Sequence, residues 1–147
     1  RGVAAYFCHN TYVAEVVDLK LAGNNPVIEN VIAAVDCGIV VNPDSARNMG
    51  EGGIVDGIGN ALFGELTFVD GAPEKTNFDK YRLIRQKEAP KSNVIHFVEN
   101  DHDPTGLGEP LFPPAFAAVA NAFHKTTGKR SYTQPFMKES DISALQM

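Results

Sequence analysis

Alternating apolar and polar positions near the start of the chain predict two neighbouring β-strands. In residues 12–21 the apolar side chains occupy every second position, which is typical of a strand with one buried face. Residues 31–41 form an almost unbroken β-branched run, which favours a strand covered on both faces. Residues 23–26 supply turn formers between them. We therefore expect these two strands to lie side by side in one sheet.

A glycine-rich helix is predicted from residue 44 to about residue 66. Asn42 can cap it, and Pro43 suits its first turn. Each interior glycine costs up to about 1 kcal/mol of helix stability relative to alanine. The high number of glycines therefore indicates that another group lies very close to the helix backbone. We expect a ligand-facing break near the helix start, at residues 49–53. Tight packing on a sheet is expected at the later glycines, Gly57, Gly59 and Gly64.

The second half of the chain predicts a hairpin, a further strand and a second helix. Asp70-Gly71 suits a tight hairpin turn, and residues 93–98 read as a strand. The second helix begins at Pro113 and ends at Gly128, a favourable left-handed cap. Its core-facing stripe is expected at Phe116, Val119 or Ala120, and Phe123.

This order of elements indicates an α+β fold. We expect a single domain over residues 1–147, with a mixed β-sheet, a β-hairpin and two main helices on one face of the sheet. With 147 residues and 44% apolar content, the chain can bury one core of ordinary size. Residues 132–147 are poorer in apolar side chains and are expected to form a peripheral tail.

Charge and composition exclude several classes of function. The net charge of −5 is spread along the chain without a basic cluster among aromatics, which argues against a nucleic-acid partner. No apolar run reaches the roughly 20 residues of a membrane span. The four histidines lack metal-ligand spacing, so we expect no metal bound directly by protein side chains. Cys8 and Cys37 are expected to be free thiols, although the sequence leaves a disulfide between them open.

The loop at residues 103–114, DPTGLGEPLFPP, carries the candidate chemistry. Glu109 lies a few residues before the second helix, and Gly106 and Gly108 remove side chains where the main chain could approach a bulky ligand. A carboxylate on such a supported loop can act as a base. It can equally accept hydrogen bonds from the free N–H groups of the coming helix. Spacing alone leaves both readings open.

Five short motifs are spread in order along most of the chain. They are V-D-C-G-I-V-V-N-P-D (35–44), M-G-E-G-G-I-V-D-G-I-G-N-A-L (49–62), T-N-F-D-K-Y-R (76–82), G-L-G-E-P (106–110) and T-G-K-R (127–130). Together they resemble the xanthine dehydrogenase and aldehyde oxidoreductase family of molybdenum hydroxylases. The chain is similar to the C-terminal part of the molybdopterin-binding subunit, especially that of the isoquinoline 1-oxidoreductase beta-subunit type. The resemblance therefore implies one lobe of a molybdopterin-binding domain.

The resemblance implies an oxidative hydroxylation of an aldehyde or N-heterocycle, with water as the oxygen source and Glu109 as the general base. The implied cofactor is molybdopterin of the dinucleotide type, which holds the metal through its own dithiolene. Many relatives carry a glutamine just before E-G-G, where this chain has Met49 and Gly50, so that the polar contact falls to Asn48 or is lost. The implied cofactor-binding residues are Gly106, Leu107, Gly108, Met49, Gly50 and Gly52.

The implied partners are the rest of the molybdopterin-binding subunit and an iron–sulfur subunit or domain, since this chain has no cysteine pattern for such clusters. Most cofactor-contacting loops of the family lie upstream, so the isolated chain is expected to be inert. The alternative is a non-catalytic binding or interaction module of the same fold, with Glu109 capping the helix. The substrate, the electron acceptor and the compartment, cytoplasmic or periplasmic, stay open.

Overall fold

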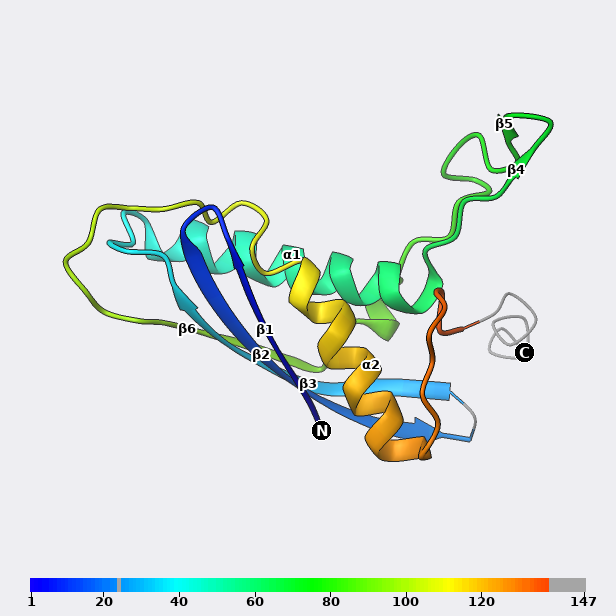
Figure 1. The fold of residues 1–147 in the computed structure, drawn as a ribbon, viewed down its shortest axis with the longest axis horizontal. Coiled ribbons are helices and arrows are strands. Elements are labelled where there is room, and N and C mark those ends of the chain that lie inside the picture. The colour runs from blue at the N-terminus through cyan, green and yellow to red at the C-terminus, as the bar shows by residue number, and fades with distance from the viewer. Residues whose placement is uncertain (24, 138–147) are drawn as a thin grey trace.

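A mixed four-stranded sheet forms the base of the molecule in this computed structural model, which describes residues 1–23 and 25–137. The strand order is β1-β2-β3-β6 (Figure 1). The first three strands pair antiparallel, and β6 pairs parallel with β3, so the predicted sheet is confirmed. Its strands are β1 (Gly2–Cys8), β2 (Thr11–Ala22), β3 (Asn25–Asp36) and β6 (Ser92–Phe97).

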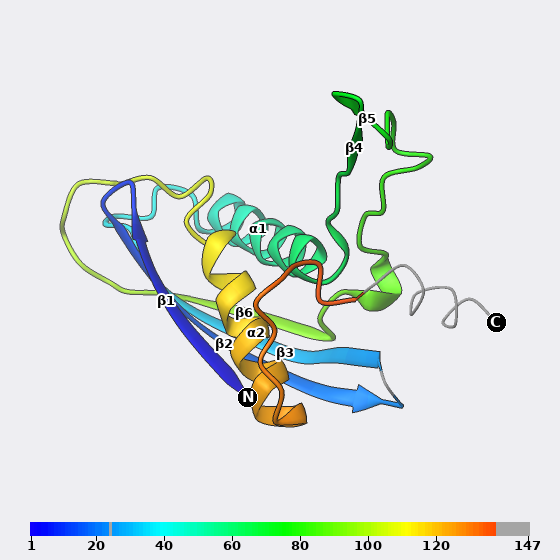
Figure 2. The same cartoon turned by 45° about the vertical axis from the view of Figure 1, so that its right-hand side comes forward.

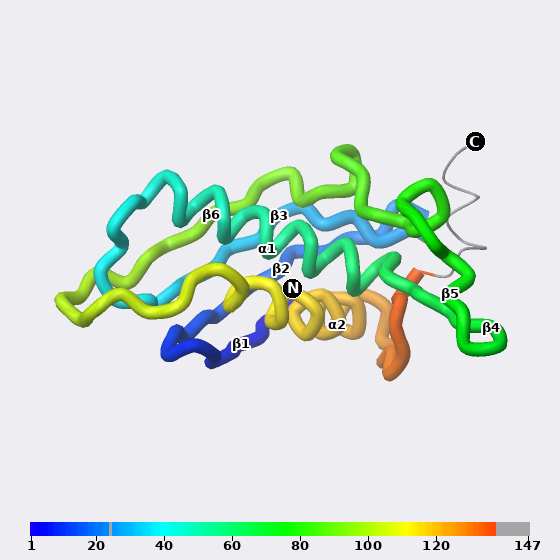
Figure 3. The backbone as a smooth tube through the Cα atoms, turned by 90° about the horizontal axis from the view of Figure 1, so that it is seen from above, coloured from blue at the N-terminus to red at the C-terminus, as the bar shows by residue number. Residues whose placement is uncertain are grey.

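Two long helices, α1 (Pro43–Phe63) and α2 (Pro113–Thr127), lie side by side on the same face of this sheet (Figures 1 and 3). α2 packs on β1 and β2, while α1 packs on β6 and on α2. The predicted α+β architecture, with its helices on one face, is confirmed. The remaining elements are the hairpin strands β4 (Phe68–Val69) and β5 (Ala72–Pro73), and a short 3-10 helix, η1 (Gln86–Glu88).

Local sequence signals set the ends of the elements as predicted. Asn42 caps α1 by accepting a hydrogen bond from the main-chain N–H of Ser45 at 3.1 Å. Gly128 ends α2 in the left-handed conformation, with φ of 72°. Asp70 and Gly71 both have positive φ, which is the geometry of the predicted hairpin turn. These signals act within a few residues, so they do not depend on contacts between distant segments of the chain.

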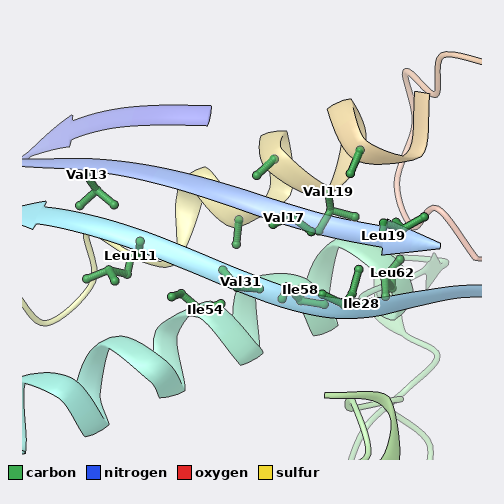
Figure 4. Packing of buried hydrophobic residues seen from close by; sticks show 14 of the residues in the cluster. Val13, Val17, Leu19, Ile28, Val31, Ile54, Ile58, Leu62, Leu111 and Val119 are labelled. Atoms are coloured by element: carbon green, nitrogen blue, oxygen red, sulfur yellow. The ribbon is translucent and has the colours of Figure 1, made fainter. Parts of the chain in front are cut away.

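The core lies between the sheet and the two helices (Figure 4). β2 alternates as predicted, with Val13 and Val17 buried. β3 also alternates, because Ile32 is 42% exposed between buried neighbours, so the prediction that both faces of this strand are covered is wrong. Both helices lie on one side, and no described element covers the other face. The buried residues of β3 after its start are Ile28, Val31, Ala33 and Val35.

The core-facing stripe of α2 includes Val119, as predicted, and Phe123 packs partly buried against the core. Its other buried positions hold alanines and a proline in place of the predicted Phe116. The reason is the close approach of β1, since a Cβ on Gly2 would overlap the main chain of Ala118 and Ala122. Phe116 instead packs on Phe112 at the flank, with ring centroids 5.1 Å apart. The buried positions are Pro114, Ala115, Ala118, Val119 and Ala122.

The glycines of α1 accommodate neighbouring chain segments. A Cβ on Gly57 would lie 2.5 Å from the carbonyl oxygen of Phe112, and one on Gly59 would lie 2.8 Å from Ile84. The packing partners of these two are therefore α2 and a loop, not the sheet that was predicted. The helix runs unbroken through residues 49–53, so the predicted break is also wrong.

Part of the expected peripheral tail packs on the domain. The main-chain N–H groups of Phe136 and Met137 donate to the carbonyls of Ala61 and Leu62, both at 2.9 Å. Met137 is buried in the core. Residues 138–147 lie outside the described residues.

Glu15 is a fully buried carboxylic acid on the helix-covered face of β2. Its cross-strand neighbours are Ala4 and Ala33, and neither carboxyl oxygen has a hydrogen-bond partner among the described residues. Burial therefore raises the pKa of Glu15 to about 8. The folded chain consequently holds this carboxyl in its protonated form at neutral pH.

The two kinds of glycine in α1 predict opposite effects of adding a methyl group. Gly57→Ala should lower the free energy of unfolding by about 1–3 kcal/mol, because the main chain of Phe112 cannot yield easily. Gly52→Ala should raise it by about 0.5–1 kcal/mol, because nothing lies within 4 Å and alanine favours the helix. Urea unfolding measures both, and shifts of the same sign would contradict this packing.

The buried carboxyl of Glu15 predicts a fall in stability as the pH rises. The pKa is about 4.5 in the unfolded chain and about 8 when folded, so the unfolded state alone ionises across this window. The free energy of unfolding should therefore fall between about pH 5 and about pH 8, by a total on the order of a few kcal/mol. Glu15→Gln should remove most of this pH dependence in urea titrations. An unchanged slope would show that another group causes it.

Candidate functional site

The loop between β6 and α2 is fastened to the β1–β2 turn and to the end of β3. The Thr105 N–H donates to the carbonyl of Cys37 at 2.9 Å, and the Gly106 N–H donates to the carbonyl of His9 at 3.1 Å. The buried hydroxyl of Thr11 donates to the carbonyl of Gly106 and bonds to the Thr105 hydroxyl at 2.7 Å. These bonds hold the loop on both sides just before Glu109.

Glu109 is paired with a histidine that sequence reasoning did not connect to it. The distance from Glu109 Oε1 to His9 Nε2 is 2.6 Å, and the two side chains are 70% and 56% exposed. His9 lies in the tight β1–β2 turn with φ of 51°, a region that histidine adopts more readily than most non-glycine residues. A carboxylate oxygen can only accept a hydrogen bond, so the imidazole N–H is the donor in this pair.

The side chain of Glu109 does not cap α2. The residue that precedes this helix is Phe112, and no side chain bonds to the first turn. Pro113 and Pro114 have no N–H to donate, and the Phe112 N–H donates to the main-chain carbonyl of Glu109 at 3.0 Å. The helix-capping role considered from the sequence is therefore absent from this geometry.

Two of the predicted cofactor-binding residues meet beside Glu109. A Cβ on Gly108 would lie 4.0 Å from the sulfur of Met49, which is 47% exposed on α1. Gly52 lies one helical turn further along, with no atom within 4 Å of the position of its missing side chain. Together His9, Met49, Gly52, Gly108 and Glu109 form an open edge of the molecule, which we call the rim site.

The other predicted cofactor-binding residues are enclosed by the protein itself. A Cβ on Gly50 would lie 2.6 Å from Ile95, and one on Gly106 would lie 2.5 Å from the Cβ of His9. Leu107 is partly buried against the core. Asn48, the alternative polar contact, is exposed on α1. The close approach that these glycines allow is therefore between segments of this chain.

The rim site suits a flat cofactor that rests on main chain. At Gly52 the space that a side chain would fill is open, and at Gly108 it meets only the sulfur of Met49 at 4.0 Å, next to the exposed carboxylate of Glu109. Across residues 1–23 and 25–137, no group of three or more His, Cys, Asp or Glu side chains is placed to hold a metal ion. A cofactor that brings its own metal ligands needs only shape and polar contacts from the protein. The same residues contain no helix long and apolar enough to cross a membrane.

Comparisons with known proteins identify the family. A family model described as "Molybdopterin cofactor-binding domain" matches residues 2–90. The chain is 31% identical over 136 residues to the isoquinoline 1-oxidoreductase subunit beta of Brevundimonas diminuta, covering 91% of this chain and 17% of the relative. It is 29% identical over 131 residues to a xanthine dehydrogenase molybdenum-binding subunit of Escherichia coli O157:H7, covering 85% of this chain and 17% of that subunit.

Solved structures contain the same fold inside longer chains. The aldehyde oxidoreductase from Desulfovibrio gigas matches with a TM-score of 0.77 and 22% identity, over 93% of this chain and 16% of that chain. Quinoline 2-oxidoreductase from Pseudomonas putida 86 matches with a TM-score of 0.71 and 23% identity, over 92% of this chain and 18% of that chain.

The chain therefore belongs to the molybdopterin cofactor-binding domain family, within the xanthine dehydrogenase family of molybdenum hydroxylases. Two of its relatives are named as molybdenum-binding subunits, of a xanthine dehydrogenase and of an aldehyde oxidoreductase, and the predicted resemblance is confirmed. The chain spans 17% of the length of the isoquinoline relative. What the whole protein does is accordingly a proposal.

The buried hydroxyl of Thr11 should keep the Glu109 loop ordered. Thr11→Val keeps the shape but removes the bonds to Thr105 and Gly106, and should cost about 1–3 kcal/mol of unfolding free energy. Hydrogen exchange at the Thr105 and Gly106 amides should become faster. Thr67→Val is a matched exposed control and should change neither. Unchanged exchange at both amides would contradict the anchoring role of Thr11.

Proposed function

We propose that this chain supplies one lobe of a molybdopterin-dependent hydroxylase, with Glu109 as its general base. The observation that carries the proposal is the pairing of an exposed Glu109 carboxylate with His9 at 2.6 Å on an anchored loop. The relatives' names supply the substrate class, an aldehyde or an N-heterocycle. When bound, the molybdenum cofactor provides the oxidising centre and activates the water-derived oxygen.

In this proposal His9 holds the side chain of Glu109 in place, and Glu109 accepts the proton. His9 Nε2 holds Oε1 of Glu109, and no described residue bonds to Oε2. Oε2 is therefore the oxygen that accepts a proton from the reacting group. The bonds from Thr11 and His9 to the loop limit the motion of the carboxylate, which is how a general base is kept within reach.

Cofactor contacts come from the open part of the rim site. Gly52 and Gly108 let a ring system lie against the main chain, and Met49 offers a polarisable side chain beside them. Gly106, Leu107 and Gly50 contribute by shaping the loop and α1, since their own surroundings are filled by protein atoms. This arrangement supports a molybdopterin as the ligand, and the dinucleotide type is what the family resemblance implies.

The rim site is one side of a cleft. Glu109 is 70% exposed, so the described residues alone provide little of the water exclusion that strengthens electrostatic catalysis. We therefore propose that the rest of a molybdopterin-binding subunit completes the cleft, and that an iron–sulfur subunit or domain takes the electrons. The isolated chain should accordingly bind little molybdenum and show no turnover.

The direct test replaces Glu109 with glutamine in the complete enzyme. Glu109→Gln keeps the shape but cannot accept the proton, so kcat should fall by about 10²–10⁴-fold at unchanged molybdenum content. Glu99→Gln, an exposed carboxylate in the same loop, is the matched control and should leave kcat unchanged. A Glu109→Gln enzyme that keeps more than about a third of the wild-type kcat would refute the assignment.

A further inference from the structure

The face of the main sheet opposite the helices is apolar, and no described element covers it (Figure 2). Its large side chains are exposed by fractions that range from 40% at Val94 to 61% at Tyr12. Soluble monomers rarely leave contiguous apolar patches larger than a few hundred Å² uncovered. The large exposed residues of this face are Val3, Phe7, Tyr12, Ile32, Val94 and Val98.

The strand register arranges the apolar part of this open face in three rows that cross the strands, and a polar row of Asp18, Asn30 and Ser92 borders it. The middle row rises least above the sheet, because it consists of the short side chains of Ala5, Ala14 and Ala34. His96 of β6 lies at its end. One neighbouring row is a ridge of β-branched side chains, Val3, Val16, Ile32 and Val94. The other contains Phe7, Tyr12 and Asp36.

The low alanine row forms a shallow hollow of about 480 Å³ that is bounded by aromatic side chains. The rings of Phe7 and Tyr12 contact each other at its border, tilted by 37° and with centroids 4.5 Å apart. The acidic and basic side chains on these rows are Asp36 and His96, and Asp36 accepts a hydrogen bond from Asn100 at 2.8 Å. The hollow therefore fits an apolar ridge of large side chains.

We propose that this open face is the docking surface for an apolar layer from the rest of the molybdopterin-binding chain. The occupant would seat large aliphatic or aromatic side chains in the alanine row, at the spacing of about 10 Å that separates packed layers. The length argues for this occupant, since the chain spans 17% of the isoquinoline relative and its fold lies within a much longer aldehyde oxidoreductase chain. The inference rests on the proposed function, because it needs that longer chain.

Docking on this face would also act on the rim site. Phe7 and Tyr12 flank the turn that carries His9, so a layer packed on their rings clamps the β1–β2 hairpin from behind. The hairpin in turn holds the loop through the His9 carbonyl and holds Glu109 through the imidazole. The docked layer thus positions the base without touching the substrate.

Thiol labelling of single cysteines in the complete molybdopterin-binding protein tests the proposal. Ala14→Cys and Ala34→Cys place thiols in the hollow, and Ala117→Cys on the exposed side of α2 is the matched control. Peptide mass spectrometry reads a maleimide label at each site, with urea-unfolded protein as the fully reactive reference. The two hollow thiols should react at least about tenfold more slowly than the control. A photo-crosslinker at position 34 should attach to a peptide of the same chain outside residues 1–147.

Equal labelling of the hollow and control thiols would overturn the proposal. Protection that disappears on dilution would overturn it in favour of a second copy, and crosslinks to another subunit would overturn it in favour of that subunit. Molybdenum content and the turnover of Glu109→Gln decide the proposed function separately. Protected thiols with undiminished Glu109→Gln turnover would refute that function alone, and exposed thiols with lost turnover would refute the docking alone.

Discussion

Two helices share one face of a four-stranded sheet, and this sharing requires main chains to approach more closely than side chains would permit. Gly2 of β1 lies against the main chain of α2 at Ala118, and Gly57 of α1 lies against the carbonyl of Phe112 at the start of α2. A Cβ at either glycine would occupy space held by backbone, which cannot move cheaply. The glycines therefore determine how α1, α2 and the sheet are spaced, and that spacing determines where the start of α2 lies in the molecule.

The position of that helix start decides where the carboxylate stands. Glu109 comes directly before the first turn of α2, and the preceding loop is bonded to the β1–β2 turn at His9 and to the Thr11 hydroxyl. The hairpin that carries His9 also carries Phe7 and Tyr12 on the opposite face of the sheet. The rim site and the open apolar face therefore share the β1–β2 hairpin. A layer that covers the open face would restrict the motion of this hairpin and thus of His9 in the rim site.

Predictions from the sequence succeeded where the signal was local. The Asn42 cap, the Asp70-Gly71 turn and the Gly128 cap depend on neighbours within a few residues, and all three are confirmed. The burial of the strand predicted at residues 31–41 was misjudged, because a run of β-branched residues occurs both in strands covered on two faces and in strands covered on one. In the stripe of α2, Val119 was predicted correctly, whereas Phe116 was not. The aromatic spacing was equally periodic, but the close approach of Gly2 leaves room only for small side chains at Ala118 and Ala122.

The sequence by itself determined the element order, the caps, the α+β class and the prominence of Glu109, because each depends on local propensity or on a short motif. Only the tertiary structure decided that His9 lies 2.6 Å from Glu109, although 100 positions separate them along the chain. It also decided that Gly50 and Gly106 lie tightly against protein atoms, while Gly52 faces open space and Gly108 has only the Met49 sulfur nearby. Pairing and burial of this kind arise when distant segments pack together, and local residue patterns do not encode which segments will meet.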